Sequence, residues 1–417
     1  MTPATPNALR REASTPASVG TRPDCTATLL LERAAAAPDA PLFARPTAQG
    51  WTDVGAADFL DEVRALARGL IAAGTGPGDR IAIMSASSYA WALADFAVWF
   101  AGGVTVPLDP SAPPEQITAV LSDARVRRVF VEDASLARAV DEAVAAAPAL
   151  GDGWLPVTLM DDDAEGATLR SLAGPGLGVS DAELERHRSA ARADSAATLV
   201  YPTGAERAGG PHEVTHGRLT GGALNLAALL PDVVGAGART LLFLPLDQLL
   251  ARTVQITCVA GGAVIGHCRA QERAADLAAF RPTFLLAVPR VLETGYATAR
   301  ARAGEGVRGA VFERAADTAR EYSAALAAAA AGHGEGPGRR LRARHAVFDR
   351  LVYRALRAGF GGSLATVVSG PGSLDPGLIH FFRGAGIEVL EASRLGLLDD
   401  EGFLSVLGLA DRQAAES

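Results

Sequence analysis

Short apolar runs alternate with helical patterns along most of this chain, and this alternation restricts its fold more than any other feature. A clear helical pattern covers 57–73, where Phe59, Val63 and Leu66 recur at helical spacing. Strands that alternate with helices predict a parallel or mixed sheet with helices on its faces, so the expected fold class is α/β. The predicted strands are 80–86, 103–109, 127–133, 197–203, 240–246, 262–266, 283–289 and 365–370.

Composition divides the chain into a tail and two α/β units. Residues 1–24 are rich in Pro, Thr, Ser and Ala, which predicts a disordered tail. Polar, glycine-rich sequence at 151–195 indicates a connecting region, so we place a first α/β subdomain at 25–195 and a second at 196–393. The second contains predicted long helices at 291–330 and 338–358, with the loop 332–338 between them.

The overall composition indicates a soluble, cytoplasmic protein. The chain is 49% hydrophobic, and its 39 basic and 47 acidic residues give a net charge of −8 with the basic residues scattered, which argues against nucleic acid as a partner. Cys25, Cys258 and Cys268 show no C-x-x-C spacing, as expected in a reducing compartment. We find no apolar core of a signal peptide and no stretch of about eighteen apolar residues that would predict a transmembrane segment.

The stretch His212-Glu213-Val214-Thr215-His216 matches the H-E-x-x-H signature of zinc metalloproteases. That motif works only on a helix, where both imidazoles share one face and the glutamate activates metal-bound water. Glycines and a proline directly upstream, and Gly217 directly downstream, leave room for only a very short helix. We therefore favour a chance match within a glycine-rich loop and predict no metal site.

Five segments taken in order resemble the AMP-forming adenylating enzymes, and within them the bacterial long-chain fatty-acid–CoA ligases. This resemblance implies two stacked α/β subdomains of the adenylating-enzyme N-terminal domain, and acyl binding in a tunnel near 244–252, 287–293 and 369–372. The segments that carry it are 51–124, 241–252, 279–293, 346–362 and 366–391.

The resemblance gives the H-E-x-x-H stretch another meaning. Adenylating enzymes have a phosphate-gripping loop similar to Y-T-S-G-T-T-G-x-P-K-G, followed by Thr-His, and the counterpart here is 201-YPTGAERAGGPHEVTH-216. His216 then matches the histidine of Thr-His, and the zinc motif is coincidental. The resemblance implies a degenerate nucleotide site that includes Tyr201, Thr203, Gly204, Arg207 and His216.

The same resemblance implies that this loop lacks much of the phosphate-binding chemistry of the family. Such a loop holds ATP phosphates through hydroxyls, glycine N–H groups and a lysine charge. Here the two threonines are Ala205 and Glu206, the next glycine is Arg207, and the lysine is Gly210. A carboxylate at 206 repels a triphosphate unless Arg207 offsets it, so we favour an ordinary exposed turn.

At the positions that the resemblance assigns to adenine and magnesium binding, some family residues are retained and others are lost. Gln248 stands where the family usually has histidine, and Ser369, Gly370 and Gly372 preserve the turn that contacts the base. Glu391 ends the Val-Leu-Glu motif. The resemblance then calls for a stacking tyrosine and a metal-binding glutamate, but the chain continues with Ser393-Arg394-Leu395-Gly396.

The end of the chain resembles a much later family element. Segment 395–412 is similar to T-G-D-x-G-x-x-D-x-x-G-F-L-x-I-x-G-R, which precedes the family's hinge. The resemblance therefore implies an internal deletion of most of the β-rich subdomain, with 394–417 as a remnant of the segment before the hinge. It also implies that the C-terminal lid domain is lacking.

Three functional hypotheses remain. The favoured one is a degenerate ligase-like pseudoenzyme that binds a long-chain acyl group or a protein partner, because the lost groups all serve phosphoryl chemistry. The alternative is an active ATP- and Mg²⁺-dependent ligase that forms acyl-AMP and then acyl-CoA, using substitute residues or a partner subunit. The third is a regulatory chain that pairs with an intact paralogue.

Overall fold

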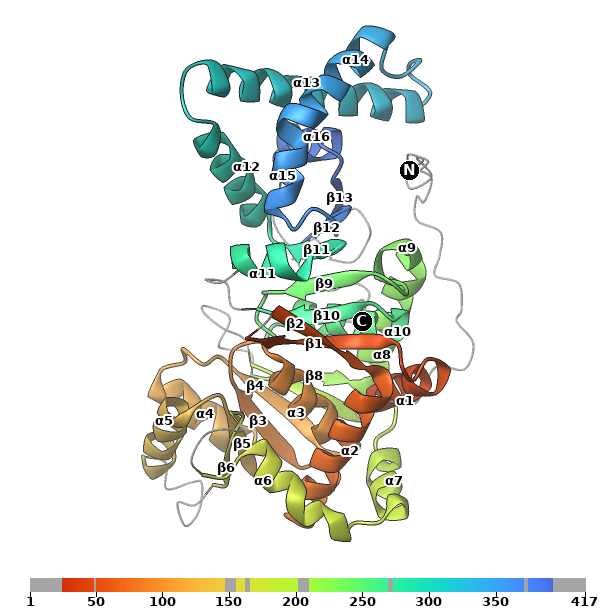
Figure 1. Ribbon diagram of the computed structural model, residues 1–417. Coiled ribbons are helices and arrows are strands. Elements are labelled where there is room, and N and C mark those ends of the chain that lie inside the picture. The colour runs from red at the N-terminus through yellow and green to blue at the C-terminus, as the bar shows by residue number, and fades with distance from the viewer. Residues whose placement is uncertain are drawn as a thin grey trace, which may run out of the picture. The chain divides into compact units, whose positions relative to one another are not determined.

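The computed structural model shows two compact units (Figure 1). The large unit comprises residues 25–237 and 242–268, and the small unit comprises 238–241 and 273–392. The predicted tail and the predicted remnant at 394–417 lie outside the described residues. The structure describes residues 25–48, 50–146, 155–161, 166–201, 210–268, 273–370 and 374–392.

One sheet of the large unit contains, among the described residues, six strands in the order β6-β5-β3-β4-β7-β8. All neighbours are parallel except β7 and β8, which are antiparallel. β7 follows the predicted boundary after residue 195 but pairs with β4, which precedes it. The strands are β3 (Arg80–Met84), β4 (Val104–Leu108), β5 (Arg128–Val131), β6 (Val157–Leu159), β7 (Ala196–Val200) and β8 (His212–Thr215).

A second group of strands in the large unit has the order β10-β1-β2, parallel and then antiparallel. These are β1 (Pro41–Thr47), β2 (Gly50–Gly55) and β10 (Val264–His267). The helices of this unit are α1 (Thr26–Ala36), α2 (Ala56–Ala72), α3 (Tyr89–Phe100), α4 (Pro114–Asp123), α5 (Ala134–Ala145), α6 (Leu169–Ala173), the 3₁₀ turn Gly174–Gly178, α7 (Asp181–Ala190), α8 (His216–Leu229), α9 (Pro231–Val234) and α10 (Leu249–Gly261).

The small unit contains parallel strands in the order β13-β12-β11-β9. They are β9 (Arg239–Leu242), β11 (Phe284–Ala287), β12 (Thr366–Ser369) and β13 (Glu388–Glu391). Its helices are α11 (Arg273–Phe280), α12 (Pro289–Ala303), α13 (Val307–Ala330), α14 (Arg339–Phe348), the π-helical turn Asp349–Tyr353, α15 (Arg354–Gly359) and α16 (Pro376–Gly384). No helix among the described residues is both long and apolar enough to cross a bilayer.

Local sequence explains where several helices begin. A side-chain oxygen before the first helical residue accepts a hydrogen bond from a backbone N–H that the helix leaves unpaired, which stabilises that end by about 1 kcal/mol. The capping residues of α3, α5, α8 and α16 are Ser88, Asp133, Thr215 and Asp375.

The core of the large unit contains a fully buried ion pair. Arg252 of α10 donates to both carboxylate oxygens of Asp95 on α3, at 2.6 and 3.1 Å. It also donates to the hydroxyls of Thr198 and Thr105, each at 2.7 Å. Burial raises the pKa of Asp95 to about 6, against the opposing effect of the Arg252 charge. One guanidinium therefore joins two helices to strands β4 and β7.

Two aromatic rings enclose this guanidinium. The Arg252 carbon Cζ lies 5.2 Å from the Trp91 ring centroid and 5.4 Å from that of Trp99. The Trp99 ring N–H donates to the carbonyl of Ala197 at 2.9 Å. The Asp95 carboxylate and the hydroxyls of Thr105 and Thr198 thus all have hydrogen-bond partners, which a buried ion pair needs in order to persist.

The eight predicted strands are present, but the structure adds others and divides the predicted helices. Strands β1, β2, β6, β8 and β13 come from segments whose strand patterns are too short or too polar to recognise. The predicted helix 291–330 breaks between α12 and α13, where Gly304 and Gly306 adopt φ of 69° and 74°. Glycine tolerates this left-handed region, which other residues rarely occupy.

Candidate nucleotide site

The strand pair β7–β8 frames the predicted phosphate loop. Val200 and His212 are register partners at the end of this antiparallel pair, so the segment 201–211 connects two adjacent strand ends. Thr203, Gly204 and Arg207 of the predicted nucleotide site lie outside the described residues. The structure therefore places the supports of the loop, namely Tyr201 on one side and Gly210 on the other.

Tyr201 lies beside a small cavity of about 310 Å³. Its hydroxyl donates to the carboxylate of Asp123 at 2.6 Å. Burial and this hydrogen bond raise the pKa of the Tyr201 phenol, so it stays neutral at physiological pH. Among the described residues of the lining, two arginines and two carboxylates offset one another: Arg80, Arg125, Asp123 and Glu213.

Gly210 occupies the position where the resemblance calls for a lysine. Its φ is 71°, in the left-handed region, and a Cβ built on it meets no atom of the described residues within 4 Å. The backbone conformation favours glycine, because a side chain in this region is strained by about 1–2 kcal/mol. The local backbone therefore suits the glycine that the sequence has.

The H-E-x-x-H stretch does not form the helix that zinc binding requires. Residues 212–215 form strand β8, and His216 begins the following helix α8. His212 is exposed, whereas His216 is fully buried. The two imidazoles therefore do not share a helix face, and no group of three His, Cys, Asp or Glu suited to a metal occurs in the described ranges.

His216 connects α8 to α1 inside the large unit. Its Nδ1 accepts a hydrogen bond from the backbone N–H of Thr26 at 3.3 Å and lies 3.0 Å from the Thr26 hydroxyl. Its ring meets Trp99 edge-on, with centroids 5.9 Å apart. Burial, followed by the Arg252 charge, lowers the pKa of His216 to about 4. Its contacts are those of a neutral core residue, and its predicted role toward nucleotide stays a prediction.

Acid is expected to destabilise the protein through this histidine. The folded-state pKa of His216 is about 4, below the usual value near 6.5, so the unfolded state binds its proton more tightly. This contribution to the free energy of unfolding is fully present above pH 6.5 and is lost as pH falls toward 4. At pH 4.5 the loss amounts to about 2–3 kcal/mol. The free energy of unfolding, measured with urea at pH 7 and at pH 4.5, should differ less between the two pH values for His216→Asn than for the wild type.

The matched control for this prediction is His333→Asn, since His333 is exposed on the loop after α13. A second buried histidine, His267, also contributes to acid sensitivity, because burial lowers its pKa to about 3. Because His267 is present in both proteins, the free energy of unfolding of His216→Asn should still depend on pH, but less than that of the wild type. Equal pH dependence of the wild type and His216→Asn would contradict the assignment.

Gln248 stands at the beginning of α10. Its backbone is extended, its side chain makes no capping hydrogen bond, and it is exposed. It keeps an amide where the resemblance calls for a histidine, so it donates and accepts hydrogen bonds but does not titrate. It belongs to the large unit, as Tyr201 does.

Asp247, next to Gln248, is a residue that the sequence analysis missed. One of its carboxylate oxygens is buried without a hydrogen-bond partner among the described residues. Burial, followed by the charge of Asp109, raises the pKa of Asp247 to about 6. Asp109 directly follows strand β4, and polar groups after parallel strands are typical of ligand sites. Their closeness was not apparent because 137 residues separate them.

The predicted base-contacting residues lie at one end of the small-unit sheet. Ala287, Ser369 and Glu391 are register partners at the carboxyl ends of β11, β12 and β13. The Gly370 N–H donates to the Ala287 carbonyl at 2.8 Å, and the Ala392 N–H donates to that of Ser369 at 2.9 Å. The structure thus brings Ser369, Gly370 and Glu391 together, while Gly372 lies outside the described residues.

Ser369 carries an unused hydrogen-bonding group at this sheet end. Its side chain is only 2% exposed, and its hydroxyl has no partner within the described part of the chain. A buried hydroxyl without a partner costs about 1–3 kcal/mol. Such a group is consistent with a ligand contact, and the role of the turn stays a prediction.

The chain matches a family model described as AMP-binding enzyme over residues 30–392. This match covers most of its 417 residues. The chain belongs to the AMP-binding enzyme family. The resemblance inferred from the five segments is thereby confirmed.

Curated relatives of this AMP-binding family member include long-chain fatty-acid–CoA ligases. The long-chain-fatty-acid–CoA ligase FadD15 of Mycobacterium tuberculosis is 37% identical over 399 residues, which cover 95% of this chain and 64% of FadD15. FadD15 of Mycobacterium bovis is 36% identical with the same coverage. The chain thus spans 64% of the length of these relatives.

Solved structures confirm the fold of this family member. The N-terminal domain of FACL13 from Mycobacterium tuberculosis superposes with a TM-score of 0.58 at 16% identity, covering 88% of this chain and 75% of that one. A long-chain-fatty-acid–CoA ligase, FadD1, from Archaeoglobus fulgidus gives 0.61 at 14% identity, covering 88% and 61%. The predicted class, an α/β fold of the adenylating-enzyme N-terminal domain type, is confirmed.

Proposed function

We propose that this AMP-binding family member is a long-chain fatty-acid–CoA-ligase-like protein in which ATP-dependent adenylation is impaired, while binding of an acyl group is retained. The acyl class comes from the names of its relatives, the FadD15 ligases. The observation that carries the proposed impairment is Gly210. The chain has a glycine with a left-handed backbone where the resemblance calls for a phosphate-binding lysine.

Physical chemistry supports the impairment. Phosphoryl chemistry depends on positioned positive charge, and removal of one such group typically costs several kcal/mol of transition-state stabilisation. The loop lacks the lysine and carries Glu206, and the charges of the cavity beside Tyr201 offset one another. These features all act against a bound triphosphate.

The alternative is an active ligase that forms acyl-AMP and then acyl-CoA. The framework favours it: strands β7 and β8 pair on either side of the predicted phosphate loop, and the turn at Ser369 and Gly370 has a hydroxyl without a partner among the described residues. Under this alternative, Mg²⁺ and ATP are the cofactors, and Arg207 supplies the missing charge. A partner subunit is a further source of catalytic groups.

Calorimetric titration with Mg-ATP separates the two proposals. We expect a dissociation constant weaker than about 1 mM, which corresponds to less than about 4 kcal/mol of binding free energy. FadD15 of Mycobacterium tuberculosis serves as the positive control. The double variant Glu206→Thr, Gly210→Lys restores the family residues and should bind Mg-ATP more tightly than the wild type, by about tenfold.

Titrations with Mg-ATP and with a long-chain fatty acid together decide between the proposals. Micromolar binding of Mg-ATP together with AMP release in the presence of a long-chain fatty acid would establish the active ligase instead. Saturable binding of the fatty acid without any nucleotide heat is the expected outcome. If neither ligand binds, a role toward a protein partner replaces the acyl-binding part of the proposal.

A further inference from the structure

The helical part of the small unit has the opposite charge to the chain as a whole. Residues 289–359 contain 13 arginines and seven acidic residues, a formal charge of +6 in a chain whose total is −8. Among the described residues, several of these arginines are exposed and form no ion pair, including Arg302, Arg308, Arg350 and Arg354. The charge follows from the sequence, whereas the exposure of these arginines comes only from the structure.

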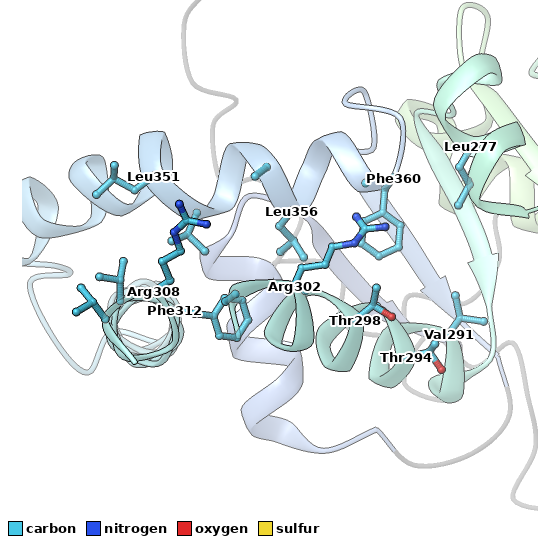
Figure 2. A pocket seen from close by; sticks show the side chains of 18 residues that line it. Leu277, Val291, Thr294, Thr298, Arg302, Arg308, Phe312, Leu351, Leu356 and Phe360 are labelled. Carbon is cyan, nitrogen blue, oxygen red and sulfur yellow. The ribbon is translucent and has the colours of Figure 1, made fainter. Parts of the chain in front are cut away.

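An apolar groove of about 670 Å³ opens on this part of the unit, between α12, the start of α13 and the segment that contains α15. Figure 2 shows Arg302 extending from α12 toward Phe360, and Arg308 extending from α13 toward the segment that carries Leu351. These two arginines are the only charged residues among the 18 that line the groove. Its interior is otherwise apolar apart from two threonines.

Large apolar side chains lie exposed beside these arginines. Val307 is 82% exposed and Leu351 is 62% exposed, and both line the groove. Val347, one turn before Leu351, is 55% exposed. Exposed apolar side chains grouped next to a hydrophobic groove mark an interaction surface, because scattered single residues are the usual arrangement.

We propose that this groove surface docks the protein on an anionic membrane. Arg302 and Arg308 bind phosphate headgroups, Val307 and Leu351 enter the interface between lipids, and one lipid acyl chain lies in the groove. Basic residues near an anionic bilayer and buried apolar side chains together give reversible peripheral binding. The groove lies within the size range of sites for small amphiphiles.

Other occupants fit this surface less well. A single-stranded nucleic acid is typically held by exposed rings on which its bases stack, but Phe312 and Phe360 of the lining are 4% and 7% exposed. A symmetric contact with a second copy would place Arg302 and Arg308 against the same positive surface, and juxtaposed like charges are unfavourable. An anionic lipid supplies both the negative charge and the alkyl chain that the groove surface matches.

Co-sedimentation of the full chain with lipid vesicles tests the docking. We expect binding to vesicles of phosphatidylcholine with phosphatidylglycerol, weakened by salt, and no binding to phosphatidylcholine alone. The double variant Arg302→Glu, Arg308→Glu should bind at least about tenfold more weakly. The matched control is Arg138→Glu, Arg186→Glu, which makes the same charge change at exposed positions on α5 and α7.

A charge-neutral pair of variants tests the groove itself. Ala355→Phe fills the groove, whereas Ala358→Phe adds the same ring to an exposed position of α15 outside the lining. We expect Ala355→Phe to weaken vesicle binding severalfold and Ala358→Phe to leave it unchanged. Circular dichroism of each variant confirms that the fold is intact, which is expected because Ala355 and Ala358 are exposed.

Several outcomes would overturn the proposal. The first is equal affinity for vesicles with and without phosphatidylglycerol, and the second is an equal loss for the control charge reversal, which would indicate attraction by total charge alone. Equal effects of Ala355→Phe and Ala358→Phe would remove the groove from the mechanism. Binding of dispersed laurate without vesicle binding would assign the groove to a soluble amphiphile.

Discussion

Replacing Arg252 by leucine is expected to lower the free energy of unfolding by about 3–5 kcal/mol. The substitution leaves the Asp95 carboxylate buried without its partner, at 0% side-chain exposure. It also removes the hydrogen bonds to Thr105 and Thr198, so the link between α10, α3 and the sheet is lost. Urea denaturation at pH 7.5, where Asp95 is ionised, measures the effect.

The control for this prediction is an exposed ion pair of the same chemistry. Arg300 and Glu313 pair on the surface with 66% and 44% side-chain exposure, so Arg300→Leu should cost less than about 1 kcal/mol. The double variant Asp95→Leu, Arg252→Leu should recover part of the loss, because no charge remains buried. A loss below 1 kcal/mol for Arg252→Leu alone would show that water reaches Asp95.

Replacing Gly384 by valine is expected to cost about 3 kcal/mol or more, because overpacking is expensive where the obstructing atoms are backbone. A Cβ on Gly384 would lie 2.0 Å from the Ala319 carbonyl oxygen. Gly384 ends α16, which packs against α13, so the two helices would have to separate. Thermal and urea unfolding of the variant measure the cost.

Gly359→Ala is the matched control, because a Cβ at Gly359 meets no atom of the described part of the chain within 4 Å and the residue lies in α15. Alanine there should be neutral or stabilise by up to about 1 kcal/mol, since it restricts the unfolded chain. Gly384→Ala should fall between the two. A neutral result for Gly384→Val would mean that α13 and α16 lie further apart than the structure shows.

The nucleotide proposal and the membrane proposal rest on different residues of the chain. The nucleotide proposal rests on Gly210 and the strand pair β7–β8, whereas the membrane proposal rests on Arg302 and Arg308. Neither experiment uses the variants of the other. A lipid-docked protein that binds an acyl group would meet its ligand where long-chain fatty acids concentrate, which makes the two proposals compatible.

Particular residues show how much of the candidate site could be predicted from the sequence. The zinc match was rejected because the glycines around it predict a loop with at most a very short helix. The structure gives a different reason, since residues 212–215 form a strand and helix α8 begins only at His216 and includes Gly217. The sequence did not reveal that His216 lies in the core hydrogen-bonded to Thr26, because the two are 190 positions apart in the chain. Asp247 was missed for the same reason, since its neighbour Asp109 follows a distant strand.

Periodicity and motif order in the sequence determined the α/β class and the family, because these depend on local spacing and residue identity. The loss of the phosphate-loop residues stays a prediction of the same kind. Only the tertiary structure decided which charges are buried and which surfaces are open. Arg252 and Arg302 look alike in the sequence, yet one is enclosed by two tryptophans and the other lines an open groove. Burial is set by packing between segments far apart in the chain, and local spacing does not encode it.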